Sequence, residues 1–212
     1  MITTVLFDVD GVLLDSIDSN YAFFTHIFNR IGYDFVSREE YAPLMHMNIY
    51  AMLKHITKVT DEKELQRLYE ESTDFSSIPS TAHLMRIPDG LTETIEALAK
   101  TYTLGIVTSR ENGTFFTIPE LQNLKHHFSV VSTYQDTTKH KPHPEPLHFA
   151  LDKIGKIAQE SVYIGDMPTD MQAAHAAGMK AISFGPEPLE KAHAHVHTLV
   201  SLPETIATLA KA

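Results

Sequence analysis

The 212-residue sequence has no cysteine and few basic residues, with 17 Lys and Arg against 27 Asp and Glu. The absence of cysteine excludes disulfides, thiolate metal sites and cysteine nucleophiles. A formal charge of −10 without a long basic run disfavours binding to nucleic acid or to anionic membranes. No stretch approaches the roughly 18 apolar residues of a membrane span. We therefore expect a soluble, cytoplasmic protein, a monomer or homodimer, with no nucleic-acid or membrane partner.

Short apolar runs that end in polar residues predict buried parallel strands. The first is Val5-Leu6-Phe7, which stops at Asp8-Val9-Asp10-Gly11. Similar runs lie at residues 104–108, 128–131, 162–164 and 181–184. Helical patterns separate most of these runs, and strands that alternate with helices predict an α/β fold. We expect a Rossmann-like parallel sheet flanked by helices on both faces.

Residues 16–87 break this alternation, because they contain one helical pattern after another. Ser37 with Glu40 has the spacing of a capping box, and Asp61 with Glu64 repeats it. We therefore predict an α/β core domain of residues 1–15 and 88–212. A small all-helical domain, residues 16–87, is inserted after the first strand.

Two carboxylates follow the first predicted strand, in Asp8-x-Asp10-Gly11. Residues at i and i+2 point the same way from a strand end, and two close carboxylates repel each other unless a cation shares them. Oxygen ligands favour Mg²⁺. Alternatively, one carboxylate is a nucleophile and the other a general acid or base. A polar turn with a helix-capping aspartate is the non-functional interpretation.

Thr108, Ser109 and Arg110 follow the second predicted strand, and Lys141 lies in a proline-rich loop further along. A hydroxyl, backbone N–H groups and a guanidinium suit an oxyanion, so these three residues are candidates for substrate binding. Arg110 could instead form a surface ion pair with Glu111 or another acid. The Lys141 ammonium suits a phosphate or crowded carboxylates, although a solvent-facing basic loop explains it equally well.

Two more carboxylates, in Gly165-Asp166-x-x-x-Asp170, follow another buried run. Asp166 lies at the expected strand end and is a candidate metal ligand. Asp170 lies in the first turns of the next expected helix, where it either supports a metal or complements the helix dipole. Ligands bind at the carboxyl ends of the strands in open α/β sheets, so all four clusters are expected to converge there.

The order of these motifs resembles the haloacid dehalogenase superfamily of phosphohydrolases, from residue 3 to about 185. The inserted helices resemble the α-helical cap that follows the first motif in that superfamily. Residues 12–16 and 173–179 are similar to the phosphoglycolate phosphatase and β-phosphoglucomutase branch. This resemblance implies that the helical domain closes over the site and recognises the leaving group.

The resemblance also implies catalytic roles for individual residues. Asp8 would be the nucleophile that forms an aspartyl-phosphate. Asp10 would protonate the leaving oxygen and then activate water. Thr108 would hydrogen-bond the phosphoryl group, and Lys141 would hold Asp8 and the phosphate oxygens.

A metal site and a function follow from the same resemblance. Mg²⁺ would be bound by Asp8, Asp166 and the main-chain carbonyl of Asp10, with Asp170 supporting it directly or through water. The implied activity is Mg²⁺-dependent hydrolysis of a small-molecule phosphomonoester, so the partner is a small phosphorylated metabolite. Dehalogenases and phosphonatases of the superfamily lack the second acid, which is present here as Asp10.

Two alternative functions stay open. A β-phosphoglucomutase-like phosphotransferase is disfavoured, because those mutases carry a histidine shortly after the first motif and this chain has none before His26. A non-catalytic relative that binds a phosphorylated ligand is disfavoured because the catalytic carboxylates are all retained. Near the C-terminus, His193, His195 and His197 alternate along an expected strand. We favour a solvated edge strand over a metal site for them.

Overall fold

The computed structural model describes the whole chain except residues 46, 48, 76–77, 111–115, 117 and 212. It divides into two compact units, Met1–Asp15 with Arg86–Ala212, and Ser16–Met85. Within the described residues, no helix combines the length and apolar character that a membrane crossing requires.

The first unit is built on a parallel six-stranded sheet with the order β3-β2-β1-β4-β5-β6. The strands are β1 (Thr4–Phe7), β2 (Thr103–Val107), β3 (Phe128–Ser132), β4 (Ser161–Gly165), β5 (Lys180–Phe184) and β6 (Ala194–Val196). The strand β1 pairs with β2 on one side and β4 on the other, and all four of its residues are buried. The predicted parallel α/β sheet is therefore confirmed, with the first motif at the end of a central strand.

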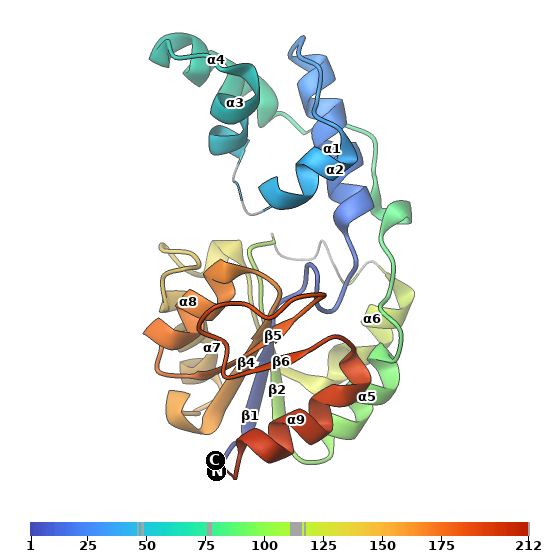
Figure 1. Cartoon of the computed structure of the whole chain (residues 1–212), viewed down its shortest axis with the longest axis vertical. Coiled ribbons are helices and arrows are strands. Elements are labelled where there is room, and N and C mark those ends of the chain that lie inside the picture. Colours follow the sequence, from blue (N-terminus) through green and yellow to red (C-terminus); the bar gives the residue numbers. More distant parts are fainter. Residues whose placement is uncertain (46, 48, 76–77, 111–115, 117, 212) are drawn as a thin grey trace. The chain divides into compact units, whose positions relative to one another are not determined.

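Helices cover both faces of this sheet. They are α5 (Leu91–Ala99), α6 (Pro119–Leu124), α7 (Glu145–Lys153), α8 (Pro168–Ala176) and α9 (Leu202–Leu209). The helices α7 and α8 lie on one side and α5 and α9 on the other (Figure 1). Leu202 and Ile206 of α9 are fully buried against this unit's own α5 and β6. Pro119 occupies the first turn of α6, where a proline is tolerated.

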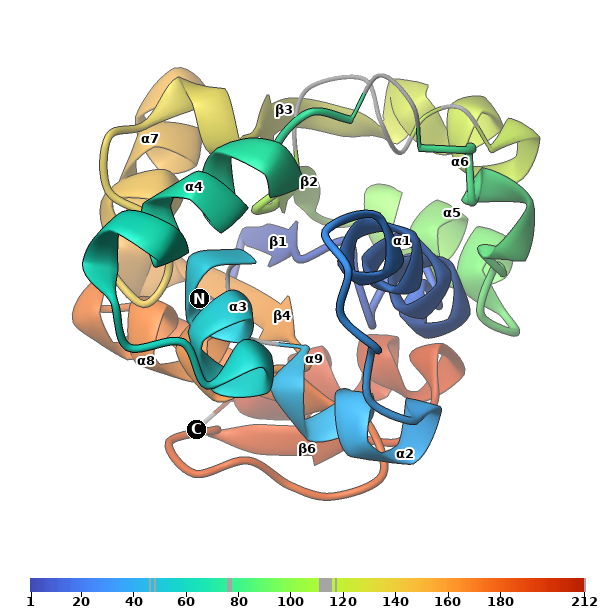
Figure 2. The same cartoon turned by 90° about the horizontal axis from the view of Figure 1, so that it is seen from above.

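The second unit is entirely helical and is inserted after β1 (Figure 2). Its helices are α1 (Ile17–Arg30), α2 (Arg38–Tyr41), α3 (Ile49–Thr57) and α4 (Glu62–Ser72). The expected capping box begins α2, with Glu40 N donating to Ser37 Oγ and Ser37 N donating to the Glu40 carboxylate. Asp61 Oδ1 accepts a 2.8 Å bond from Glu64 N at the start of α4. The core consists of Ile27, Phe28, Tyr41, Met52, Leu53, Leu65 and Leu68.

Short 3₁₀ helices complete the secondary structure. They lie at Ala42–Leu44, Ala82–Leu84, Lys125–His127, Tyr134–Asp136, Ala158–Glu160 and Leu199–Ser201. Where the chain leaves and re-enters the first unit, Asp15 and Arg86 form an antiparallel bridge with two 2.9 Å backbone hydrogen bonds. This bridge joins the segment after the first motif to the segment that leads into α5.

The alternating histidines contact the neighbouring strand β5 and the residue that follows it. His193 Nδ1 accepts from Ala181 N at 3.1 Å, and His195 Nδ1 lies 2.8 Å from Ser183 Oγ. His197 Nδ1 lies 3.0 Å from the Gly185 carbonyl oxygen. No histidine belongs to the potential metal cluster found among the described residues. These side-chain contacts therefore stabilise the position of the edge strand β6 in the sheet.

Candidate active site

Asp8 continues the central strand β1 and is buried. Its backbone N–H donates to the Ile164 carbonyl at 2.9 Å, which extends the β1–β4 pairing by one residue. The side chain is held by the next peptide, because Val9 N donates to Asp8 Oδ1 at 2.8 Å. This leaves Oδ2 to face the rest of the site.

Two glycines make room for the neighbouring carboxylates. Gly11 has a positive φ of 70°, and a Cβ there would lie 1.9 Å from Asp166 Oδ2. At Gly165 a Cβ would lie 2.4 Å from the Asp170 Cβ. Real Cβ atoms essentially never approach within 3.0 Å, so a side chain at either position would force the neighbouring carboxylate to shift.

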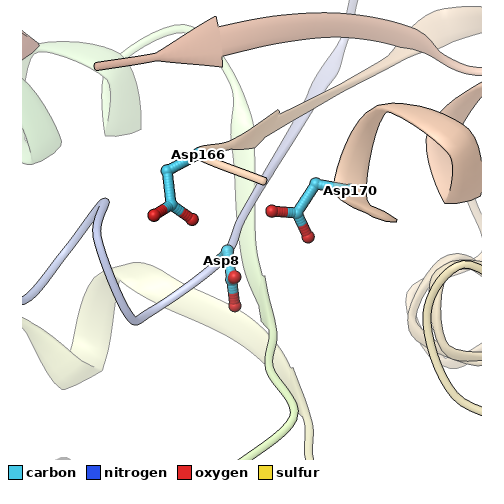
Figure 3. A group of neighbouring side chains, drawn as sticks. All are labelled: Asp8, Asp166 and Asp170. Atoms are coloured by element: carbon cyan, nitrogen blue, oxygen red, sulfur yellow. The ribbon is translucent and has the colours of Figure 1, made fainter. Parts of the chain in front are cut away.

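Asp8, Asp166 and Asp170 form one carboxylate cluster (Figure 3). Each contributes an oxygen, and these oxygens all lie within 4.8 Å of one another. Burial, together with the charges of Asp170 and Asp8, raises the pKa of Asp166 to about 8. Burial also raises the pKa of Asp8, to about 7, although the Lys141 charge opposes the shift. The unliganded cluster therefore resists being fully ionised.

Lys141 supplies a buried positive charge beside two of these carboxylates. Its Nζ lies 3.0 Å from Asp8 Oδ2 and 2.8 Å from Asp170 Oδ1. Burial would lower the pKa of Lys141, but the charges of Asp170 and Asp8 outweigh it and raise this pKa well above its usual value. The loop lysine therefore lies inside the site, charged, and not on a solvent-facing loop.

Asp170 caps its own helix and also contacts the lysine. Oδ2 accepts from Met167 N at 3.0 Å, which satisfies a backbone donor at the start of α8. Oδ1 accepts from Lys141 Nζ at 2.8 Å. The capping role that the sequence suggested is thus present, and the same side chain also contacts the lysine of the site.

Tyr163 is a site residue that sequence reasoning missed. Its hydroxyl donates to the Val107 carbonyl at 2.9 Å and accepts from Lys141 Nζ at 3.0 Å, in a fully buried position on β4. The Tyr163 hydroxyl therefore holds the Lys141 ammonium close to the sheet. The available signal was a hydroxyl-bearing residue in the otherwise apolar run Val162-Tyr163-Ile164.

Thr108, Ser109 and Arg110 follow β2, next to the end of β1. Thr108 is buried, and its Oγ1 accepts from Arg110 N at 3.1 Å. Ser109 is exposed. The Arg110 guanidinium contacts Asp10, with Nε–Oδ2 and Nη2–Oδ1 distances of 2.7 Å each. The ion-pair alternative for Arg110 is thus realised, and its partner is the second carboxylate of the first motif.

A cavity of about 480 Å³ borders the carboxylate cluster within the first unit. It is lined by Gly11, Asp15, Arg86, Ile87, Pro88, Asp89, Asp166, Phe184, Gly185 and Pro186. Asp8, Thr108 and Lys141 are not part of its lining. The cavity therefore reaches the cluster from the side of Asp166.

The residues present fit a divalent cation with a preference for oxygen ligands. Asp166 Oδ1 is buried, yet it accepts no hydrogen bond from the described part of the chain. Such an orphaned anionic oxygen is costly unless a cation or water satisfies it. The donors here are carboxylates, which suit Mg²⁺. Asp166 is the ligand that the arrangement offers most directly, since both oxygens of Asp8 and both oxygens of Asp170 already have partners in the described part of the chain.

Comparisons with known proteins give matches over most of the chain. Residues 5–184 match the family model described as haloacid dehalogenase-like hydrolase. A relative named pyrophosphatase PpaX, from Bacillus cereus, is 31% identical over 180 residues, which cover 84% of this chain and 81% of the relative. Among solved structures, a Geobacter sulfurreducens hydrolase of subfamily IA has a TM-score of 0.73 at 26% identity, covering 97% of this chain and 96% of that one. A Clostridium difficile β-phosphoglucomutase, at 21% identity, shares the fold with a TM-score of 0.75, covering 98% of this chain and 96% of that one.

Proposed function

The chain belongs to the haloacid dehalogenase-like hydrolases, and from that premise we propose that it is a Mg²⁺-dependent phosphohydrolase of a small phosphorylated substrate. The observation that supports this best is the buried ion pair of Lys141 with Asp8 beside the orphaned oxygen of Asp166. This arrangement supports the proposal, because it combines a carboxylate, a fixed positive charge and an anionic oxygen without a hydrogen-bond donor among the described residues. A phosphoryl group needs all three, because its own charge repels a carboxylate nucleophile.

In the first half-reaction, an oxygen of Asp8 attacks phosphorus and the bond to the leaving oxygen breaks. The electron pair of that bond passes to the leaving oxygen, which takes a proton from Asp10. Lys141 neutralises charge on Asp8 and on the phosphoryl oxygens, and the Thr108 hydroxyl donates to one of those oxygens. The product is a phosphoryl group covalently bound to Asp8.

In the second half-reaction, water attacks the same phosphorus and Asp10 accepts its proton. The bond between phosphorus and Asp8 breaks, inorganic phosphate leaves, and both aspartates return to their starting states. Covalent catalysis divides one difficult displacement into two easier ones. Asp8, Asp166 and the main-chain carbonyl of Asp10 would hold Mg²⁺, with Asp170 in support, and the ion would supply charge neutralisation for the phosphoryl group.

The substrate that we propose first is a phosphomonoester of a small metabolite. The relative named pyrophosphatase supports adding inorganic pyrophosphate to the substrates tested. Both contain a terminal phosphoryl group and differ in the leaving group. The catalytic groups Asp8, Asp10, Thr108 and Lys141 would serve either reaction.

The test is release of inorganic phosphate from p-nitrophenyl phosphate and from pyrophosphate, with Mg²⁺ or with EDTA. We expect turnover that requires Mg²⁺ and is lost in Asp8→Asn. Asp152→Asn, which changes an exposed acid on α7, is the matched control and should keep its activity. Wild-type turnover that persists in Asp8→Asn would contradict the nucleophile. A mutase would be favoured instead if ³¹P NMR showed interconversion of sugar phosphates with little release of inorganic phosphate.

A further inference from the structure

Arg110 binds both oxygens of Asp10. The two contacts, from Nε and Nη2, are each 2.7 Å long. The two side chains are 13% and 29% exposed, so the pair is largely shielded from solvent. Two parallel bonds of this kind form the strongest and most directional arginine–carboxylate contact.

The backbone of Arg110 is held on both sides. Its N–H donates to Thr108 Oγ1 at 3.1 Å, and its carbonyl accepts from Tyr134 N at 2.9 Å. These bonds join the ends of β2 and β3 and fix the position from which the guanidinium reaches the end of β1. The contact with Asp10 is therefore a built feature of the site and differs from a mobile surface pair.

This contact has a consequence for the proposed reaction, on which the inference rests. Asp10 transfers a proton to the leaving oxygen only if one of its carboxylate oxygens can reach that atom. In the structure both oxygens accept from Arg110. Loosening the pair at one oxygen frees that oxygen to turn toward the leaving atom of a substrate.

The charges of the site indicate what would separate the pair. The site contains four carboxylates and two cations, which give a formal balance of minus two: Asp8, Asp10, Asp166, Asp170, Lys141 and Arg110. A divalent cation would neutralise this balance, and Lys141 and that cation would together attract the transferring phosphoryl group. A second anion on the leaving group then competes with Asp10 for Arg110.

We infer that Arg110 is a positioning residue that restrains Asp10 and releases it to substrates whose leaving group carries its own negative charge. The matching substrates are phosphoanhydrides, such as pyrophosphate, and phosphomonoesters with a second phosphate or a carboxylate. A neutral leaving group offers nothing to the guanidinium, so Asp10 stays restrained and turnover is slow. Specificity for charge thus comes from the chain's own ion pair.

Kinetics with a matched pair of esters tests this inference. Phosphoglycolate and 2-hydroxyethyl phosphate are close in size, both lose an alkoxide, and only the first has a carboxylate on the leaving group. We expect wild-type kcat/KM to favour phosphoglycolate by at least about tenfold, which corresponds to about 1.4 kcal/mol. Arg110→Gln should bring the ratio close to one, and Arg110→Lys should restore part of it. Arg67→Gln removes an equally paired but exposed arginine and should leave the ratio unchanged.

A spectroscopic measurement on the wild-type protein covers the case in which Arg110→Gln folds poorly. The ¹⁵N–¹H signal of Arg110 Nε, assigned by its loss in Arg110→Lys, should move when Mg²⁺ and methylenediphosphonate are added. Mg²⁺ with inorganic phosphate should leave it in place. Equal responses to both anions, or a ratio unchanged in Arg110→Gln, would overturn the inference while phosphatase activity remains. Absence of Mg²⁺-dependent turnover on p-nitrophenyl phosphate and on both esters would instead overturn the proposed function, and this inference with it.

Discussion

Gly11→Ala is expected to damage Mg²⁺ binding through a single steric conflict. The new methyl group would lie 1.9 Å from Asp166 Oδ2 and 2.4 Å from its carboxyl carbon. The first distance is more than 1 Å shorter than 3.0 Å, the closest contact that real Cβ atoms make, so the carboxylate must move. That carboxylate includes the orphaned oxygen that we assign to the cation.

A control variant separates the backbone penalty of Gly11→Ala from its steric conflict with Asp166. A non-glycine residue in the left-handed region costs roughly 1–2 kcal/mol of stability. Gly155 also has a positive φ, of 64°, and a Cβ there would meet nothing within 4 Å. Gly155→Ala should therefore lower the free energy of unfolding by about 1–2 kcal/mol and leave Mg²⁺ affinity intact. Gly11→Ala should carry the same backbone penalty and also weaken Mg²⁺ binding at least about tenfold, the lower range for a misplaced ligand.

Urea unfolding without metal measures the backbone penalty, and titration calorimetry with Mg²⁺ measures affinity. The expected pattern is similar loss of stability in both variants and loss of affinity in Gly11→Ala alone. The reasoning is refuted if Gly11→Ala binds Mg²⁺ as tightly as the wild type. It is also refuted if Gly155→Ala weakens binding to the same extent.

Three further predictions concern protons, the buried tyrosine and the helical unit. Because the folded-state pKa values of Asp8 and Asp166 are raised to about 7 and about 8, the metal-free folded protein holds protons that the unfolded chain has released. Its free energy of unfolding should fall from about pH 4 to pH 8, by up to about 1.4 kcal/mol per pH unit and proton. Mg²⁺ binding near pH 6.5 should then release protons, and an enthalpy independent of buffer ionisation would contradict this. Tyr163→Phe removes a hydroxyl with two buried partners, so urea unfolding should show a loss of about 1–3 kcal/mol; no loss would mean that the bonds are replaced. Asp61→Ala should lower stability by about 1 kcal/mol and Asp61→Ser, which keeps an acceptor, by less; equal losses would argue against capping.

The features that could be predicted from the sequence are those with a local cause. An apolar run that stops at Asp8 predicts a buried strand, because the sequence changes from apolar to polar within one residue. The Ser37 and Asp61 caps follow from a spacing of three residues, which brings each side chain to a backbone N–H. Convergence of the motifs follows from parallel strands, whose carboxyl ends share an edge.

Partners within the site could not be predicted in the same way, because they depend on which strands are neighbours. The residues around Tyr163 give no indication that its hydroxyl accepts a hydrogen bond from a lysine 22 positions earlier. A tyrosine in a buried run is equally consistent with simple packing, since its ring is largely apolar. For Lys141, the sequence left a solvent-facing loop as an equal alternative, and only the fold places it in contact with two carboxylates.

Strand order explains why the ion pair of Arg110 with Asp10 could not be predicted from the sequence. The strand β1 lies between β2 and β4, so the residues that follow β2 and β4 flank Asp8 and Asp10 from opposite sides. Neighbouring strands are only about 4.8 Å apart, which is within the reach of an arginine side chain. The two residues are 100 positions apart in the chain, and an alternative partner, Glu111, is adjacent to Arg110. Sequence distance favours the adjacent acid, whereas the sheet brings Asp10 within 2.7 Å of the guanidinium. The fold thereby connects a residue expected to bind substrate with the residue expected to transfer the proton, and this connection makes leaving-group charge the property to vary first in a substrate screen.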